Sequence, residues 1–175
     1  MTGKTHIMGG IASCTAIAYY YGYDPVLMAA SGAFGALVPD ICHTRSKIGR
    51  KFPLLSKIIS SVFGHRTFTH SLLFMLIMFF IITTYIPNQS IQAGLMVGMA
   101  SHLLLDAWTV NGIKLLFPST IRIRLPFYMR TGSFSEQLVL AGLTIISCYY
   151  FYELFHGHIG AAFSLPGATF FSSFT

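Results

Sequence analysis

The sequence predicts an all-α, polytopic membrane bundle that forms a single domain over residues 1–175. Hydrophobic residues make up 54% of the chain and charged residues only 9%, whereas soluble domains carry about 25% charged residues. The apolar residues fall into about five stretches near the ~20 residues that a helix needs to cross a bilayer core. The connections between them are short, so no separate water-soluble domain is expected.

The five predicted segments lie near residues 5–22, 25–40, 67–86, 91–110 and 136–155. The first is expected to stay in the protein, because it lacks a small-residue cleavage site and similar segments follow it. The second is short, either a span or a re-entrant segment, and its Gly32, Gly35 and Ala36 permit close approach of a neighbouring backbone. Gly94 and Gly98 permit the same in the fourth segment, within one chain or between two chains.

Two connections have recognisable patterns. Residues 54–63 place apolar side chains at helical spacing beside Lys57, which predicts a short helix lying in the membrane interface. Residues 111–135 are interrupted by glycines and prolines, and their alternating stretch IRIRLPFY can form a short extended segment. We therefore expect a structured loop there.

The basic residues predict an orientation in the membrane. If all five segments cross, the eleven lysines and arginines fall on one side, and cytoplasmic loops carry such an excess. The N-terminus is then cytoplasmic and the C-terminus outside, in a prokaryotic cytoplasmic (inner) membrane. The net charge of +6 is dispersed among loops, which favours membrane lipids over nucleic acid as partners.

Acidic residues are so scarce, five in all, that each is informative. His102 and Asp106 are spaced i, i+4, which places both on one helical face, and Asp40 and His43 are three apart. The predicted topology brings further polar groups to the same cytoplasmic face. The full set is His6, Asp40, Cys42, His43, His65, His70, His102, Asp106 and Glu136. Imidazole and carboxylate favour zinc, with manganese or magnesium as alternatives.

Each candidate also has a structural interpretation. Asp40 and Asp106 lie near helix C-termini, where the helix dipole disfavours a carboxylate, so a metal cation is favoured there. Glu136 suits the N-terminus of its helix, and Ser133 can cap it in an S-x-x-E pattern, so it is either a cap or a site residue. A single interfacial histidine such as His65 is commonly a capping residue.

The remaining cysteines, basic residues and histidines are weighed in the same way. Three widely spaced cysteines predict no disulfide framework. Cys14 and Cys148 are expected to pack in apolar segments, whereas Cys42 can offer a thiolate between Asp40 and His43. The basic residues near the site either fix the topology or bind a substrate phosphate. His156 and His158 are expected outside the site.

Five ordered motifs together resemble the YdjM-like family of membrane-bound metal-dependent hydrolases: THIMGG, LVPDICHTRSKIGRK, HRTFTHSLL, SHLLLDAWTVNGIKLLFP and RTGSFSE. The resemblance covers about residues 4 to 140. It implies a metal site of His6, Asp40, His43, His70, His102 and Asp106, with His65, Arg66, Ser71 and Glu136 close by. The family pattern looks like P-D-I-D-H, and Cys42 replaces its second acidic residue, which shifts the preference toward zinc. The H-x-x-x-D pattern is also similar to that of zinc-dependent phospholipase C and related nucleases.

The function expected from these features is a metal-dependent hydrolase at the cytoplasmic membrane face that cleaves a lipid phosphoester or another membrane-embedded ester. Glu136 or His65 would act as general acid or base, and Arg66 would stabilise developing charge. An alternative is a metal-ion or proton-coupled transporter that uses the same cluster, although transporters place such groups near the midplane. In a third interpretation the metal only holds short helices together.

Overall fold

The computed structural model describes residues 1–43, 46, 50–51, 53–54, 57, 67–119 and 121–163, with side chains described as far as His156. Within these residues it is a helical bundle without a β-strand, which confirms the all-α class. Its elements are α1 (Gly3–Tyr21), α2 (Pro25–Gly35), η1 (Val38–Cys42), η2 (Phe68–His70), α5 (Leu72–Tyr85), α6 (Gln89–Ala107) and α7 (Phe134–Phe163). Most of the interfacial helix predicted at residues 54–63 lies outside the described residues.

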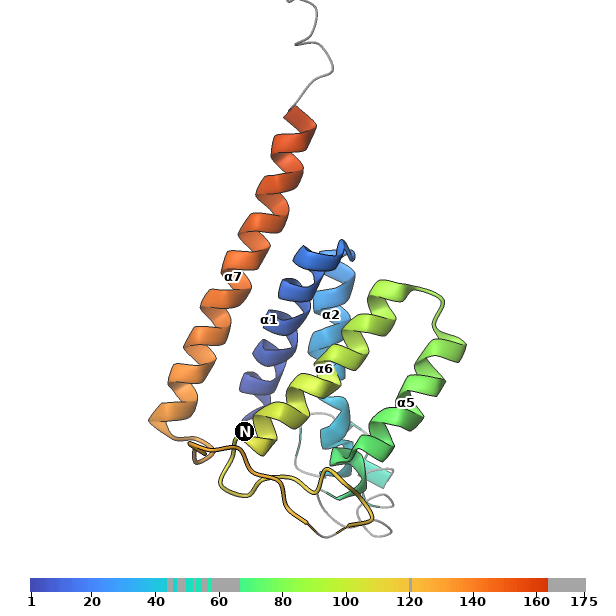
Figure 1. Ribbon diagram of the computed structural model, residues 1–175, viewed down its shortest axis with the longest axis vertical. Coiled ribbons are helices and arrows are strands. Elements are labelled where there is room, and N and C mark those ends of the chain that lie inside the picture. The colour runs from blue at the N-terminus through green and yellow to red at the C-terminus, as the bar shows by residue number, and fades with distance from the viewer. Residues whose placement is uncertain are drawn as a thin grey trace, which may run out of the picture.

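Helices α1, α2 and α6 form the centre of the bundle. Helix α6 packs against both α1 and α2, α7 lies along α1, and α5 contacts α6 (Figure 1). Helix α7 is the longest element and projects beyond the others (Figure 1). The N-terminus and the loop that precedes α7 lie at the same end of the bundle, so elements distant in sequence meet there.

Glycines allow the central helices to touch through their backbones. A Cβ atom added at Gly10 would lie 2.5 Å from the carbonyl oxygen of Gly32, and one added at Gly98 would overlap the same oxygen. Gly94 faces the backbone of Met28 in the same way. The close packing that these glycines predict is therefore confirmed, and at these positions it occurs within one chain.

Polar caps define where the helices begin. Asp24, Ser71 and Asn88 accept hydrogen bonds from the backbone N–H three residues ahead, at 2.8, 3.2 and 3.0 Å. Helix α5 therefore starts at Leu72, later than predicted. Ser133 accepts from the N–H of Glu136 at 3.4 Å, as the S-x-x-E pattern predicts.

The segment between α6 and α7 is a structured loop, as predicted. Two isolated bridges, between Thr109 and Met129 and between Ile113 and Ile123, hold it together. It is joined to the bundle by hydrogen bonds from the N–H of Leu72 to the carbonyl of Leu115 and from the N–H of Leu125 to that of Ala107. The loop therefore closes the end of the bundle beneath α5 and α6.

The second predicted segment is not one regular helix. Proline has no N–H, so Pro39 cannot bond to the carbonyl four residues earlier, and α2 ends at Gly35. The chain resumes as a 3₁₀-helix in which the N–H of Asp40 bonds to Leu37 at 3.2 Å, three residues back. This change leaves the carbonyl of Ala36 available to a partner outside its own helix.

Two stretches meet the length and hydropathy expected of a membrane span, Pro25–Cys42 and Phe134–His156. Helix α5 is apolar but has 14 residues, which corresponds to about 21 Å, short of the ~30 Å hydrocarbon core. Helices α1 and α6 carry polar residues of the site described below. The prediction of helices is confirmed at all five segments, whereas the number of crossings stays a prediction.

Replacing Gly98 with alanine is expected to lower the free energy of unfolding by about 1–3 kcal/mol, because the new methyl group would overlap the backbone of α2. Gly142→Ala in α7 is the matched control, since nothing lies within 4 Å of its added Cβ atom. Alanine favours a helix over glycine, so this control should unfold at the wild-type temperature or above it. Thermal unfolding in detergent measures both. Equal midpoints for the two variants would contradict the packing.

Candidate metal centre

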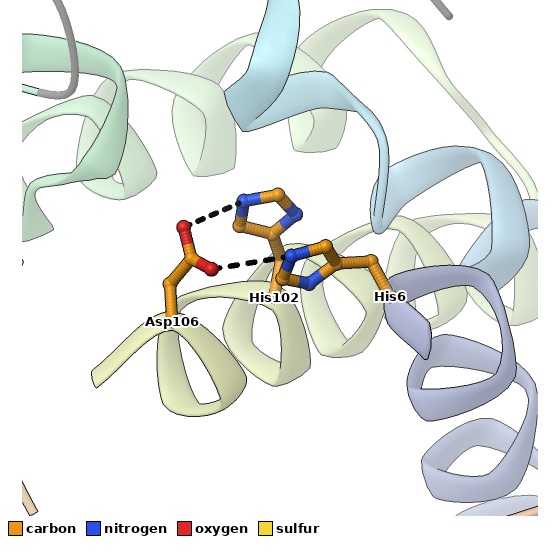
Figure 2. Close-up of side chains that lie close together, drawn as sticks. All are labelled: His6, His102 and Asp106. Atoms are coloured by element: carbon orange, nitrogen blue, oxygen red, sulfur yellow. Dashed lines mark ion pairs between the residues drawn. The ribbon is translucent and has the colours of Figure 1, made fainter. Parts of the chain in front are cut away.

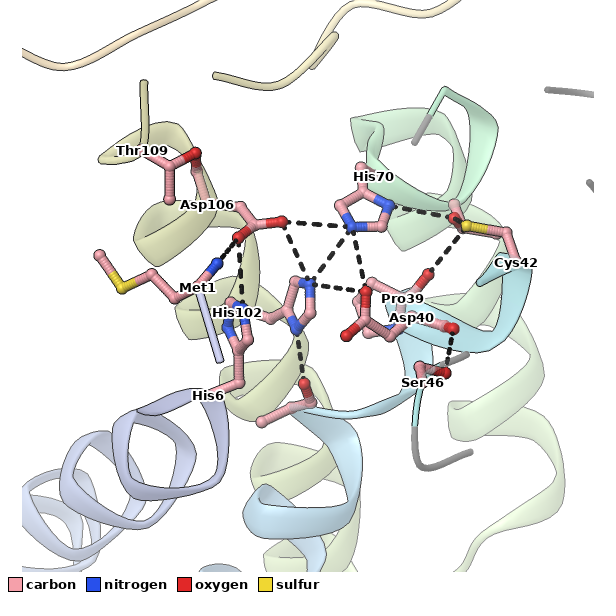
Figure 3. A network of polar contacts seen from close by, with 12 residues as sticks. Met1, His6, Pro39, Asp40, Cys42, Ser46, His70, His102, Asp106 and Thr109 are labelled. Carbon is pink, nitrogen blue, oxygen red and sulfur yellow. Dashed lines mark hydrogen bonds and ion pairs between the residues drawn. The ribbon is translucent and has the colours of Figure 1, made fainter. Parts of the chain in front are cut away.

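Five polar residues from four elements converge at one end of the bundle, and we call them the His/Asp cluster (Figure 3). They are His6 of α1, Asp40 of η1, His70 of η2, and His102 and Asp106 of α6. The side chains are fully buried except for that of Asp40, which is 15% exposed. Burial of ionisable groups in a membrane protein is costly and marks functional sites.

Asp106 lies at the centre of the cluster, where its two carboxylate oxygens contact different histidines. Its Oδ1 lies 3.2 Å from His6 Nε2, and its Oδ2 lies 3.5 Å from His70 Nε2 and 3.7 Å from His102 Nε2. Figure 2 shows the carboxylate beside the imidazoles of His6 and His102, in contact with both, and the two rings stack with their centroids 3.7 Å apart. The amino group of Met1 lies 2.6 Å from Oδ1. A positive charge thus already contacts this carboxylate.

Asp40 completes the other half of the cluster. Its Oδ1 lies 3.8 Å from His70 Nε2 and 3.9 Å from His102 Nε2, and these two nitrogens are 3.3 Å apart. Ligand atoms around a tetrahedral zinc ion, each ~2.0–2.1 Å from it, are roughly 3.3 Å apart. Two ligand groups result, His6–His102–Asp106 and Asp40–His70–His102, in each of which the ligand atoms lie within 4.8 Å of one another. These buried groups could hold a metal ion.

Hydrogen bonds orient two of the imidazoles for this role. His102 Nδ1 lies 2.6 Å from the carbonyl oxygen of Ala36, which can only accept, so Nδ1 carries the proton. Thr69 donates its hydroxyl to the sulfur of Cys42 at 3.1 Å, and its oxygen can then accept from His70 Nδ1, also at 3.1 Å. In the neutral rings of His70 and His102, each Nε2 therefore carries a lone pair. These two lone pairs face each other and the carboxylates of Asp40 and Asp106. Metal-binding histidines are commonly oriented in this way.

The cluster therefore attracts positive charge. Among the described residues His6 Nδ1 has no hydrogen-bond partner, whereas its Nε2 faces Asp106 Oδ1 at 3.2 Å. Leaving a buried polar group without one costs about 1–3 kcal/mol. A bound cation would remove this cost and would separate the facing lone pairs of His70 and His102.

The predicted residues separate into three sets. The structure brings His6, Asp40, His70, His102 and Asp106 together. It leaves Cys42 and His43 outside the two ligand groups. Cys42 contacts the cluster through Thr69, and its thiol donates to the carbonyl of Pro39 at 3.7 Å. His65 and Arg66 lie outside the described residues.

Glu136 connects the start of α7 to the start of α1. Its Oε1 accepts hydrogen bonds from the N–H of Thr2 at 2.5 Å and from the hydroxyl of Thr5 at 2.7 Å. Its Oε2 accepts from the N–H of Gly132 at 2.6 Å. Because Thr5 directly precedes His6, this carboxylate holds the segment that delivers His6 to the cluster.

Sequence reasoning missed the groups that orient the imidazoles. The carbonyl of Ala36 has no side-chain signal, although Pro39 marks the helix break that frees it. Thr69 precedes His70 directly but has no spacing pattern of its own. The contact between Met1 and Asp106 joins positions 105 residues apart.

Comparison with known proteins agrees with a membrane setting. Residues 1–163 match the model of the family described as YdjM inner membrane protein. The chain is 85% identical over 159 residues to the uncharacterized protein YvsG of Bacillus subtilis (strain 168), which covers 91% of this chain and 99% of that protein. It is 34% identical over 163 residues to the inner membrane protein YdjM of Escherichia coli (strain K12), which covers 85% of this chain and 82% of that protein.

The inner membrane protein YdjM of Shigella flexneri matches at the same 34% identity over 163 residues. No solved structure matches the chain. The family match and the match to the two YdjM proteins both extend over most of the chain. The chain belongs to the YdjM inner membrane protein family.

Proposed function

We propose that this protein is a metal-dependent hydrolase that acts at the cytoplasmic face of the membrane on a lipid phosphoester or another membrane-embedded ester. The observation that carries the proposal is the convergence of imidazole Nε2 atoms and carboxylate oxygens, 3.2 to 3.9 Å apart, in a buried cluster. Hydrogen bonds that hold their other nitrogens orient His70 and His102 toward this point. Such a preorganised donor set is typical of a catalytic or structural metal site.

The donor chemistry favours zinc. Imidazole nitrogens and carboxylate oxygens together suit zinc, and manganese or magnesium are the alternatives for an oxygen-rich half of the site. Asp106 belongs to one ligand group and its Oδ2 lies 3.5 Å from His70 of the other, so it could act as a ligand in either. When bound, a divalent ion would supply Lewis acidity and activate water at neutral pH.

The residues of the chain would then hold the ion in place and transfer protons to and from the substrate. His102 and Asp40 hold one side of the site, and His6 and Asp106 hold the other. Glu136 and His65 are the proposed general acid or base, and Arg66 the proposed group that stabilises negative charge on the substrate. The three hydrogen bonds of Glu136 support a positioning role for α1 in addition.

We also propose five membrane crossings with a cytoplasmic N-terminus. The N-terminus and the loop between α6 and α7 lie at the same end of the bundle. Lys4 lies near the start of α1, and the loop contains Lys114, Arg122 and Arg130. Positive charges of this kind remain in the cytoplasm. The His/Asp cluster would then lie where it can meet lipid headgroups.

Purified protein is expected to carry at least one divalent ion per chain, zinc above all, measured by elemental mass spectrometry. The double substitution His102→Ala, Asp106→Ala should abolish this binding, because it removes ligands from both groups. His156→Ala is the control, since this exposed histidine lies in α7, and it should keep the full metal content. Wild-type protein that stays empty after incubation with zinc, manganese and magnesium would rule out the site.

Metal-loaded protein is expected to hydrolyse at least one member of a panel of lipid phosphoesters in detergent micelles. The same double variant should lose the activity at least ~100-fold, the size of effect expected when a catalytic stabilising group is removed. His156→Ala should keep it. Metal uptake into sealed vesicles without any hydrolysis would instead support the transporter.

A topology test follows from the charge distribution. Alkaline phosphatase fused to the C-terminus should be active, because the proposed orientation exports that end. The same enzyme fused after Ser119, in the loop between α6 and α7, should be inactive, while a fluorescent protein at that position should fold and fluoresce. Phosphatase activity at Ser119 would reverse the orientation.

A further inference from the structure

An apolar cavity lies on the side of α6 next to the His/Asp cluster. It has a volume of about 330 Å³, and α5, α6 and the loop between α6 and α7 form its walls. Every lining side chain is apolar, and Leu103, Ala107 and Ile113 form its buried part. Small-molecule sites have volumes of about 300–1,000 Å³, so the cavity is large enough for part of a ligand.

The cavity and the cluster share their supporting elements. On α6, Leu103 and Ala107 directly follow the cluster residues His102 and Asp106. Successive residues of a helix point about 100° apart, so the same two turns of α6 serve both sites. On the other wall, Leu72 follows His70 by two residues and its N–H bonds to Leu115 of the loop at 2.9 Å.

The opening of the cavity is continuous with an apolar surface. Leu72 and Leu104 line the cavity and are still 48% and 59% exposed. Leu73 and Leu76 of α5 extend this surface and are 40% and 53% exposed. In a membrane protein such a surface faces lipid chains, and an opening in it is reached from the bilayer. A polar ligand would lose its hydrogen bonds in a cavity without polar atoms.

We propose that the cavity binds an acyl chain of a membrane lipid, with the lipid's polar head toward the His/Asp cluster. The acyl-chain site stands on the cavity alone, and the orientation of the head rests on the proposed function. The site would give the hydrolase its substrate class, because one chain in the cavity keeps the ester group near the ligands on α6. Lipids with two hydrophobic chains would leave the second chain in the bilayer.

Photolabelling tests the site. Protein in lipid nanodiscs that contain phosphatidylglycerol with a diazirine near the end of one acyl chain is irradiated, digested and analysed by mass spectrometry. Adducts are expected on Leu115 and Ile123, which lie in the loop and line the cavity. Adducts on Ile145 of α7, which is 69% exposed, report contact with bulk lipid.

Two variants separate the cavity from the general lipid surface. Ala100 is exposed and lines the cavity, so Ala100→Phe fills it and should cause a several-fold loss of adducts on Leu115 and Ile123 without changing those on Ile145. Ala30→Phe is the matched control, because Ala30 is exposed on α2 and does not line the cavity, and it should leave all adducts unchanged. If Ala100→Phe does not fold, Leu104→Gln at the opening should reduce the same adducts.

Undiminished adducts on the loop in Ala100→Phe would overturn the proposal. So would labelling of Ile145 without any labelling of Leu115 or Ile123, since the cavity would then be closed to lipid or filled by another protein segment. Photolabelling needs no turnover, so it can succeed while every phosphoester is left intact. Conversely, hydrolysis without loop adducts would show that the substrate chain binds elsewhere.

Discussion

The structure depends on the burial of a carboxylate and three imidazoles that face one another away from water. Asp106, His6, His70 and His102 are all fully buried. Taking such groups out of water costs several kcal/mol for each ion unless charge of the opposite sign compensates it. The amino group of Met1 supplies part of that charge. A divalent cation would supply the rest, so metal binding and the packing of α1, α6 and η2 are expected to stabilise each other.

The interruption of α2 gives this cluster its geometry. A regular α-helix that continued past Pro39 would have lost one backbone hydrogen bond. In it the carbonyl of Ala36 would have accepted from the N–H of Asp40, four residues ahead. The 3₁₀ turn instead releases that carbonyl, which accepts from His102, and then places Asp40 opposite the same imidazole. One local break thus contributes both a group that orients His102 and a candidate metal ligand, Asp40. The glycines of α1, α2 and α6 bring the backbones close enough for these contacts.

Helix α6 separates two environments that a lipid hydrolase would need. His102 and Asp106 lie among the candidate metal ligands, while Leu103 and Ala107 line the apolar cavity. The cluster consists of ionisable side chains, whereas the cavity is lined only by apolar ones. The two lie on adjacent faces of the same helix. The loop after α6 closes the cavity and carries basic residues such as Lys114 and Arg122.

Local patterns in the sequence were enough to predict a helix in each of the five segments, the cap at Ser133 and the pairing of His102 with Asp106 on one face. These features depend on residues within a few positions of one another, where hydrophobic runs, capping side chains and helical spacing act directly. The choice among the more distant candidates was decided only by the tertiary structure. It joined His6, Asp40 and His70 to that pair, left Cys42 and His43 outside the two ligand groups, and used Gly98 to pack within the chain. The physical reason is that the meeting of side chains from separate helices depends on helix breaks, glycine contacts and backbone carbonyls, and spacing along the chain does not encode these directions.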